Sequence, residues 1–303
     1  MKRVLVAVVL TAGALSTAGC TGDQDAGGGP PASVASLPPP PVTATPSVSN
    51  LNDTRLPLDR YTTTVDQFID LDYASKMVAA DCMKRFGITY KFGRQNLDAL
   101  RDRTNRLGLM DEAEAKQNGY HGDPEDVAQY TQTDSAHTNL TDDQALVLLG
   151  TRPGLQAPEG VPAGGCIGEG HSKVQWNLEE DSWLEDQTNE AATRTFADER
   201  ALTVIARWSA CMKESGYRYD TPDDANNDQR WWKDDSVVAS GPEIKTAVAD
   251  VRCKKKVNYL DQMTSILTAY QQQIVENNAE RLETAHRNTQ NALKNAATVL
   301  SGR

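Results

Sequence analysis

The sequence predicts a mainly α-helical fold: an irregular helical domain stapled by disulfides, with a long helix at its C-terminal end. Three observations support this fold class. A nine-residue pattern typical of a helix end occurs twice, apolar residues recur at three- and four-residue steps ahead of both copies, and four cysteines follow the N-terminal leader. The alternating strand–helix–strand pattern of a parallel sheet is not found in the sequence.

The repeated pattern, C-M-K-x-x-G-x-x-Y, covers Cys82–Tyr90 and Cys211–Tyr219. Its glycine, Gly87 or Gly216, can adopt the left-handed conformation that closes a helix, because glycine has no Cβ. The lysine of each copy lies in the last helical turn, where a positive charge complements the helix dipole. Each copy therefore predicts a helix C-terminus with its cysteine on the buried side.

The chain begins with a sorting signal. Two basic residues precede the apolar stretch Val4–Leu15, which is too short to span a bilayer. The small residues before Cys20 resemble a bacterial lipobox, although Thr17 stands where leucine is usual. We therefore expect residues 1–19 to be a lipoprotein signal peptide and Cys20 to be lipidated, which anchors the chain at the extracytoplasmic face of the cell membrane. An ordinary secretory peptide cleaved nearby is the alternative.

The segment after Cys20 has the composition of a linker. Residues 21–50 contain seven prolines, three consecutive glycines and no aromatic side chain, so they cannot bury enough apolar surface to fold. We expect residues 20–50 to be the lipid anchor and a disordered tether, with polyproline character around Pro38–Pro41. The disulfide-stapled helical domain is expected over residues 51–275, and residues 276–303 are expected to form the distal part of the C-terminal helix.

The first half of this domain is expected to be a series of helices. Apolar spacing predicts a helix from about Val65 to Phe86, and an acidic stretch predicts a short one from about Asp111 to Gln117. Thr141 is a suitable N-cap because two aspartates follow it in the first turn, and this helix should end at Gly150. A further helix is expected from Gly164 through Trp176.

The second half is expected to contain longer helices. One, from about Glu190 to Glu214, carries the second copy of the repeated pattern. The last begins at Ser240–Pro242, and no further proline or glycine follows until Gly302. An unbroken helix of about sixty residues would extend about 90 Å, which exceeds the diameter of the globular part. Its distal half should therefore fold back, project into solvent or pack on a partner helix.

Four cysteines in an exported chain indicate two disulfides, because the extracytoplasmic environment is oxidising. Three pairings are possible, and spacing alone does not choose among them. We favour Cys82–Cys166 and Cys211–Cys253, because this scheme gives each copy of the pattern a downstream partner.

Composition and motifs argue against several functions. The formal net charge of -11 and the pI of about 4.9 disfavour nucleic-acid binding, since no basic stripe offsets repulsion from phosphate. No serine-hydrolase, zinc-protease or phosphate-loop motif is found. We therefore expect no enzyme, no cofactor and no catalytic residue. The four histidines are scattered through the chain: His121, His137, His171 and His286.

Metal sites were weighed and are not expected. His121 and the aspartate two residues later fit a turn, and no second histidine lies at ligand spacing. Cys166 and His171 lack a third ligand. The loop Asp224–Asp228 matches the first ligand positions of a calcium loop, but Gln229 occupies the place that requires glycine.

Aromatic residues of the second half are candidates for ligand contact. Trp231 and Trp232 are adjacent and could form a platform for a sugar ring, with Tyr219 as a third contact. The simpler explanation is that these side chains pack in the core. The sequence leaves both roles, ligand contact and core packing, open for these side chains.

Several of these features together resemble a group of actinobacterial secreted lipoproteins that have no assigned activity. The resemblance covers about residues 65–275 and implies a helical, exported protein, with no catalytic residue to carry over. Besides the lipobox and the proline-rich tether, the matching features are Cys82-Met83 before Gly87, Gly165-Cys166-Ile167-Gly168-Glu169, Trp208 before Cys211-Met212, Gly216-Tyr217, and Ala249-Asp250 ahead of Cys253.

The sequence leaves three functions open. The leading hypothesis is a membrane-anchored, non-enzymatic interaction module that contacts an envelope protein through its C-terminal helix. The second is a lipoprotein that binds a glycan or a small ligand, and the third is a hydrolase without a recognisable motif.

Overall fold

The computed structural model describes residues 37–43, 47–48, 54–95, 97, 107–122, 140–233 and 238–302. Over these residues the regular structure is helical, apart from one isolated bridge between Arg152 and Leu155, which confirms the predicted fold class. The signal peptide, Cys20 and the tether up to residue 36 lie outside the described residues. None of the described helices is both long and apolar enough to cross a bilayer.

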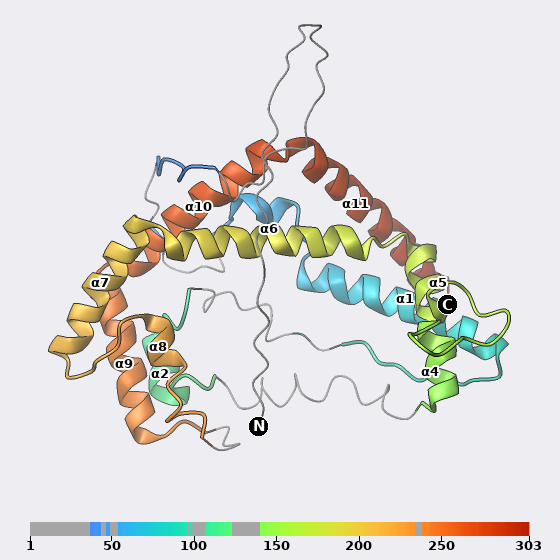
Figure 1. The fold of residues 1–303 in the computed structure, drawn as a ribbon, viewed down its shortest axis with the longest axis horizontal. Helices are drawn as coiled ribbons and strands as arrows, with labels where there is room; N and C mark the ends of the chain where they lie inside the picture. The colour runs from blue at the N-terminus through green and yellow to red at the C-terminus, as the bar shows by residue number, and fades with distance from the viewer. Residues whose placement is uncertain are drawn as a thin grey trace, which may run out of the picture.

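The helices form an arch (Figure 1). Helices α1, α4 and α5 form one end, and α2, α7, α8 and α9 form the other, with α6 running between them. Helix α10 rises from the second end to the top of the arch, and α11 descends from there to the first end. A 3-10 helix, η3, covers Pro57–Arg60 and packs on α10. The α-helices are α1 (Val65–Arg85), α2 (Glu112–Asn118), α4 (Asp142–Leu149), α5 (Gly165–Val174), α6 (Leu178–Ala197), α7 (Glu199–Glu214), α8 (Pro222–Asn226), α9 (Gly241–Lys256), α10 (Tyr259–Asn277) and α11 (Ala279–Ser301).

The predicted helix boundaries follow from local capping. Thr64, Thr141 and Ser240 each accept a hydrogen bond from the third residue of the helix they start, and that residue's side chain bonds back to the cap. At the other ends, Gly87 and Gly216 have positive φ angles of 74° and 89°. Both copies of the repeated pattern close with the same pair of backbone bonds, the Schellman arrangement expected of a glycine C-terminus.

The predicted helix over Glu190–Glu214 is wrong in its extent. Two helices, α6 and α7, meet at Asp198, whose backbone is extended with ψ of 135°. The Asp198 side chain accepts from the backbone N–H of Arg200 and so caps α7. An aspartate at this point stabilises a new helix start more than it stabilises the continuation of α6.

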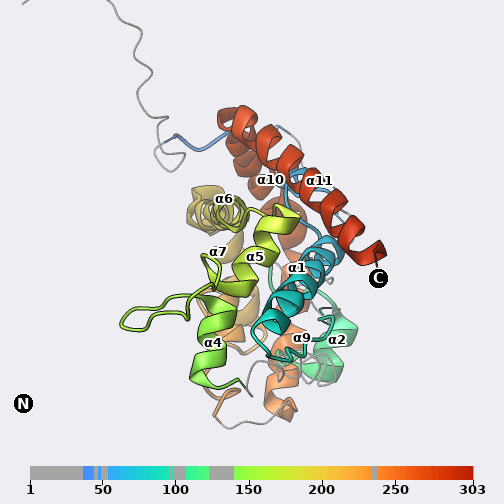
Figure 2. The same cartoon turned by 90° about the vertical axis from the view of Figure 1, so that its right-hand side faces the viewer.

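The C-terminal run is helical as predicted, but it breaks twice. Asn258 adopts a left-handed conformation with φ of 55° between α9 and α10, and Asn278 separates α10 from α11. Asparagine tolerates such conformations better than most residues. Of the three courses left open by the sequence, α11 takes the first: it folds back along α1 and contacts α5 (Figure 2). The distal segment therefore shares the core of the body.

Part of the predicted tether lies on the body. Within residues 20–50, the described residues 37–43 and 47–48 contact α6, α7 and α10. Arg194 donates to the Leu37 carbonyl at 2.7 Å and Arg200 to the Pro40 carbonyl at 2.9 Å. Prolines offer only carbonyl acceptors and hold a preformed extended conformation, so a row of side-chain donors can bind them at low entropic cost. The prediction of disorder therefore does not hold for these residues.

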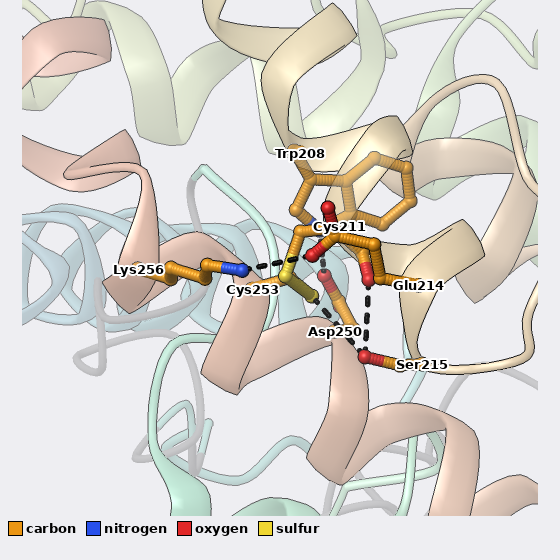
Figure 3. The surroundings of a disulfide bond; sticks show 7 residues. All are labelled: Trp208, Cys211, Glu214, Ser215, Asp250, Cys253 and Lys256. Atoms are coloured by element: carbon orange, nitrogen blue, oxygen red, sulfur yellow. Dashed lines mark hydrogen bonds and ion pairs between the residues drawn. A yellow bond between two sulfur atoms is a disulfide. The ribbon is translucent and has the colours of Figure 1, made fainter.

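Both predicted disulfides are present. Cys82 pairs with Cys166, joining α1 to α5, and Cys211 pairs with Cys253, joining α7 to α9. The Cα–Cα distances are 5.4 and 5.6 Å, within the usual range for a disulfide. Each bridge fixes a closing helix of the repeated pattern to a helix that follows it in the chain, and Figure 3 shows the second one, Cys211–Cys253.

Candidate ligand-binding cavity

A cavity of about 740 Å³ opens at the second end of the arch, between α7, α8 and α9 and the segments that flank α2. This volume lies within the range of small-molecule sites. Its wall combines apolar side chains with a few polar groups from distant parts of the sequence. The lining residues include Tyr120, His121, Leu202, Asp223, Asp250 and Lys254.

The first polar group of the wall is His121, which is fixed by Glu243. Gly119 ends α2 with φ of 58°, and a Cβ there would lie 2.6 Å from a Glu243 carboxylate oxygen. The absence of a side chain lets the chain pass directly over this carboxylate. The Tyr120 backbone N–H then donates to Glu243 Oε1 at 2.9 Å, and His121 Nδ1 lies 2.7 Å from the same oxygen. Glu243 is itself held by the capping box of α9 through Ser240.

One ring nitrogen of His121 is left without a partner. The side chain is 6% exposed, and its buried Nε2 has no hydrogen-bond partner among the described residues. Trp232 stacks on the imidazole with ring centroids 4.3 Å apart. When the imidazole is neutral and Nδ1–H donates to Glu243, Nε2 is an acceptor. A buried polar atom without a partner is costly, so this acceptor favours a ligand that brings a donor.

The second polar group is a buried ion pair between Asp250 and Lys254. Lys254 Nζ lies 2.9 Å from Asp250 Oδ2 and also donates to the Leu109 carbonyl. Asp250 accepts further bonds from Trp208 Nε1 at 2.9 Å and from the Tyr120 hydroxyl at 3.4 Å. Burial raises the pKa of Asp250, and these partners oppose the rise. In Figure 3 the Trp208 ring and Asp250 lie beside the Cys211–Cys253 disulfide, so the pair joins the cavity wall to the stapled core.

The remaining wall is apolar and partly open. Phe196 and Leu202 line the cavity with 39% and 50% of their surface exposed, whereas Ile205 is buried in the main core. Exposed large apolar residues at the edge of a cavity are common at ligand sites. The cavity therefore offers apolar contact near its opening and polar groups along its wall.

The predicted contact residues lie nearby but do not form a common platform. Trp231 is 6% exposed and donates to the Ala225 carbonyl, whereas Trp232 is 46% exposed and donates to the Asn226 carbonyl. The Tyr219 hydroxyl donates to Asp228 at 2.8 Å and accepts from Arg230. Of the three predicted contacts, Trp232 is the one that touches the site, through its stack on His121.

The residues considered as metal ligands have other roles. Cys166 is in a disulfide, Asp224 bonds to Thr221 in the capping box of α8, and Asp228 binds Arg230. Among the described residues, no cluster of three or more His, Cys, Asp or Glu side chains is placed to hold a metal. Asp123 lies outside the described residues.

Sequence reasoning missed the pairing of His121 with Glu243, because 122 positions separate them. Two local signals do mark the place: the capping box that begins α9 and the glycine that ends α2.

Comparisons with protein-family models, with curated proteins and with solved structures give no match.

Proposed function

We propose that the chain is an exported lipoprotein, anchored to the membrane through Cys20, that binds a small organic ligand without catalysing a reaction. The observation that supports ligand binding is the 740 Å³ cavity beside a buried histidine whose Nε2 has no partner among the described residues. This was the second of the functions that the sequence left open. Its contacts would be His121 and the cavity wall more than Tyr219 and Trp231.

Two features support export and anchoring. The N-terminal leader ends in a lipobox-like stretch before Cys20, and the four remaining cysteines form two disulfides. Structural disulfides form in oxidising compartments, so they favour an extracytoplasmic location. A diacylated cysteine provides the two chains needed for stable membrane attachment.

The interaction-module hypothesis keeps less support. It was motivated by a C-terminal helix longer than the body, and α11 instead lies along α1 with Leu282 and Ala292 buried. An envelope protein or a cell-wall glycan could still contact the outer face of the arch, but no described feature selects one.

A hydrolase keeps less support as well. A histidine oriented by a carboxylate is also the arrangement of a general base. However, no described hydroxyl or thiol donates to His121 Nε2, so nothing among the described residues marks a side-chain nucleophile that this histidine would activate. We therefore propose binding alone.

The cavity can be tested by blocking its opening. Leu202→Trp places a large ring at the cavity edge, and Leu155→Trp makes the same change at a residue of equal exposure, 49% against 50%, outside the cavity lining. The proteins are purified from native membranes, and bound small molecules are measured by native mass spectrometry. A bound molecule in the wild type and in Leu155→Trp, reduced at least about tenfold in Leu202→Trp, supports the proposal. No bound molecule, or equal amounts in both variants, overturns it.

The anchor can be tested separately. Cys20→Ala should move the protein from the detergent phase to the aqueous phase of a phase-separating detergent, because acyl chains supply the membrane affinity. Thr21→Ala is the neighbouring control and should stay in the detergent phase. Retention of Cys20→Ala in the detergent phase would show that the attachment has another origin.

A further inference from the structure

The charges around the cavity are unbalanced toward the negative side. Lys254 is the cation of the described wall, and its charge is matched by Asp250 at 2.9 Å. Both side chains of this pair are at most 1% exposed. Asp223 also lines the cavity, and it accepts a hydrogen bond from the neutral side-chain amide of Asn227 at 2.8 Å. A ligand in the cavity therefore meets a carboxylate that the ion pair does not neutralise.

The raised pKa values of two tyrosine hydroxyls reflect burial and the same excess of negative charge. Burial raises the pKa of Tyr259, and the negative charges of Asp250 and Asp223 raise it further. Burial likewise raises the pKa of Tyr120, with added contributions from Asp250 and Glu243. Both residues line the cavity, so the potential there opposes a second negative charge and favours a positive one.

We infer that the cavity selects ligands that carry a protonated amine on an apolar body. The inference rests on the proposed function and names its ligand class. The ammonium would donate to His121 Nε2 and face Asp223, while the apolar body would pack on Phe196 and Leu202. Anionic ligands are disfavoured, because the wall's ammonium is already paired with Asp250 and a ligand carboxylate would meet the like charge of the exposed Asp223.

Binding at His121 requires one movement. Nε2 is not open to solvent, and Trp232 covers one face of the ring. Trp232 is also the most exposed tryptophan of the site, held by one hydrogen bond to the Asn226 carbonyl. We expect Trp232 to turn off the imidazole when the amine binds at Nε2, and binding should then change the tryptophan fluorescence of the protein.

The test uses three ligands with the same ring and different heads: 2-phenylethylamine, 2-phenylethanol and 3-phenylpropionate. Each is titrated calorimetrically into the mature, folded chain. The amine should bind at least about tenfold more tightly than the carboxylate, with the alcohol between them. Asp223→Asn should weaken the amine about two- to fivefold and leave the alcohol unchanged. Glu214→Gln removes the same charge at an exposed residue outside the cavity and should change neither.

Each contrary result has a distinct meaning. Equal or tighter binding of the carboxylate, or an amine affinity unaffected by Asp223→Asn, overturns the ligand class. Failure of all three compounds to bind overturns it too. The proposed function is judged independently by the contrast between Leu202→Trp and Leu155→Trp, and it survives if that contrast holds while the amine preference fails.

Discussion

The two ends of the arch use the same helix-closing pattern and the same kind of staple around different interiors. At the first end, Cys82–Cys166 lies in a cluster with the apolar side chains of Met83, Val147 and Leu148. At the second, Cys211–Cys253 lies beside Trp208, whose indole N–H binds the buried Asp250. The repeated pattern thus specifies a helix end and a bridge, and the residues outside it decide what the bridge encloses.

The distance between packed backbones differs at the two disulfides, and this difference accounts for the 740 Å³ cavity at the second end. At the first end α5 touches both α1 and α4 through glycine: a Cβ on Gly170 would overlap the backbone of Ser75 in α1, and one on Gly165 would overlap that of Leu148 in α4. At the second end, rings such as Trp208 and Tyr259 separate the helices around an ion pair. Backbone contact leaves no space, whereas packing through large side chains leaves a hollow.

The largest effects should come from the disulfides. In the chain-entropy model, loss of the Cys82–Cys166 bridge, which spans 84 residues, costs about 4.6 kcal/mol, and loss of Cys211–Cys253, which spans 42, costs about 3.9 kcal/mol. Cys211→Ser and Cys253→Ser should destabilise to similar extents, each leaving one free thiol, as measured by urea unfolding and thiol labelling. If removing Cys211–Cys253 costs clearly more than removing Cys82–Cys166, the buried Asp250–Lys254 pair depends on the Cys211–Cys253 disulfide.

Removing one ion of the buried Asp250–Lys254 pair at the second end should have the next largest effect. Asp250→Ala leaves the Lys254 ammonium buried and should cost about 3 kcal/mol, the lower end for such changes, because the Leu109 carbonyl remains as a partner. The double change Asp250→Leu with Lys254→Met should recover most of the loss. If urea unfolding shows no recovery, the Asp250–Lys254 ion pair stabilises the fold more than the apolar side chains that replace it.

Acid should weaken the junction between α6 and α7 at Asp198. Hydrogen bonds from the Arg200 side chain are the main cause that holds the pKa of Asp198 at about 2, with help from the Arg200 backbone and Tyr270. A lowered pKa means that the stabilisation is present above pH 4 and is lost as pH falls toward 2. We expect a loss of about 2 kcal/mol across this window in pH-dependent urea unfolding. Asp198→Asn should be less stable at pH 6 and show a flatter profile; a parallel profile would contradict the assignment.

The smallest effect should be the same at both ends. Gly87 and Gly216 have positive φ, and a Cβ at either position would meet nothing within 4 Å. Alanine should therefore cost about 1 kcal/mol at each site through backbone strain alone. Unequal costs in urea unfolding would show that the two copies of the pattern are not structurally equivalent.

The elements that could be predicted from the sequence are those set by neighbours in the chain. Caps such as Thr141 and Ser240 and the closing glycines follow from short-range patterns, and the structure confirms them. The cysteine pairing was favoured among three because the pattern occurs twice, and the structure has that pairing. The helix break at Asp198 was missed because an aspartate inside a helical run is only weakly unfavourable until a partner such as Tyr270 fixes it.

The candidate cavity could not be predicted, because its residues are brought together by tertiary packing. His121 lies after α2, Glu243 begins α9, and Asp250 and Lys254 read as ordinary residues of an amphipathic helix. The adjacent tryptophans gave a partial indication, since Trp232 stacks on His121. Their opposite burial depends on how the turn after α8 packs, which no local pattern specifies.

The contacts made by residues 37–43 also limit how far the molecule can stand from a bilayer. If Cys20 carries the proposed acyl chains, seventeen residues separate it from Leu37, where Arg194 holds the backbone. A fully extended chain of that length spans at most about 60 Å, against roughly 100 Å for a linker that ran free to residue 50. Attachment of the chain at Leu37 would therefore hold the body closer to such an anchor than a linker that ran free to residue 50.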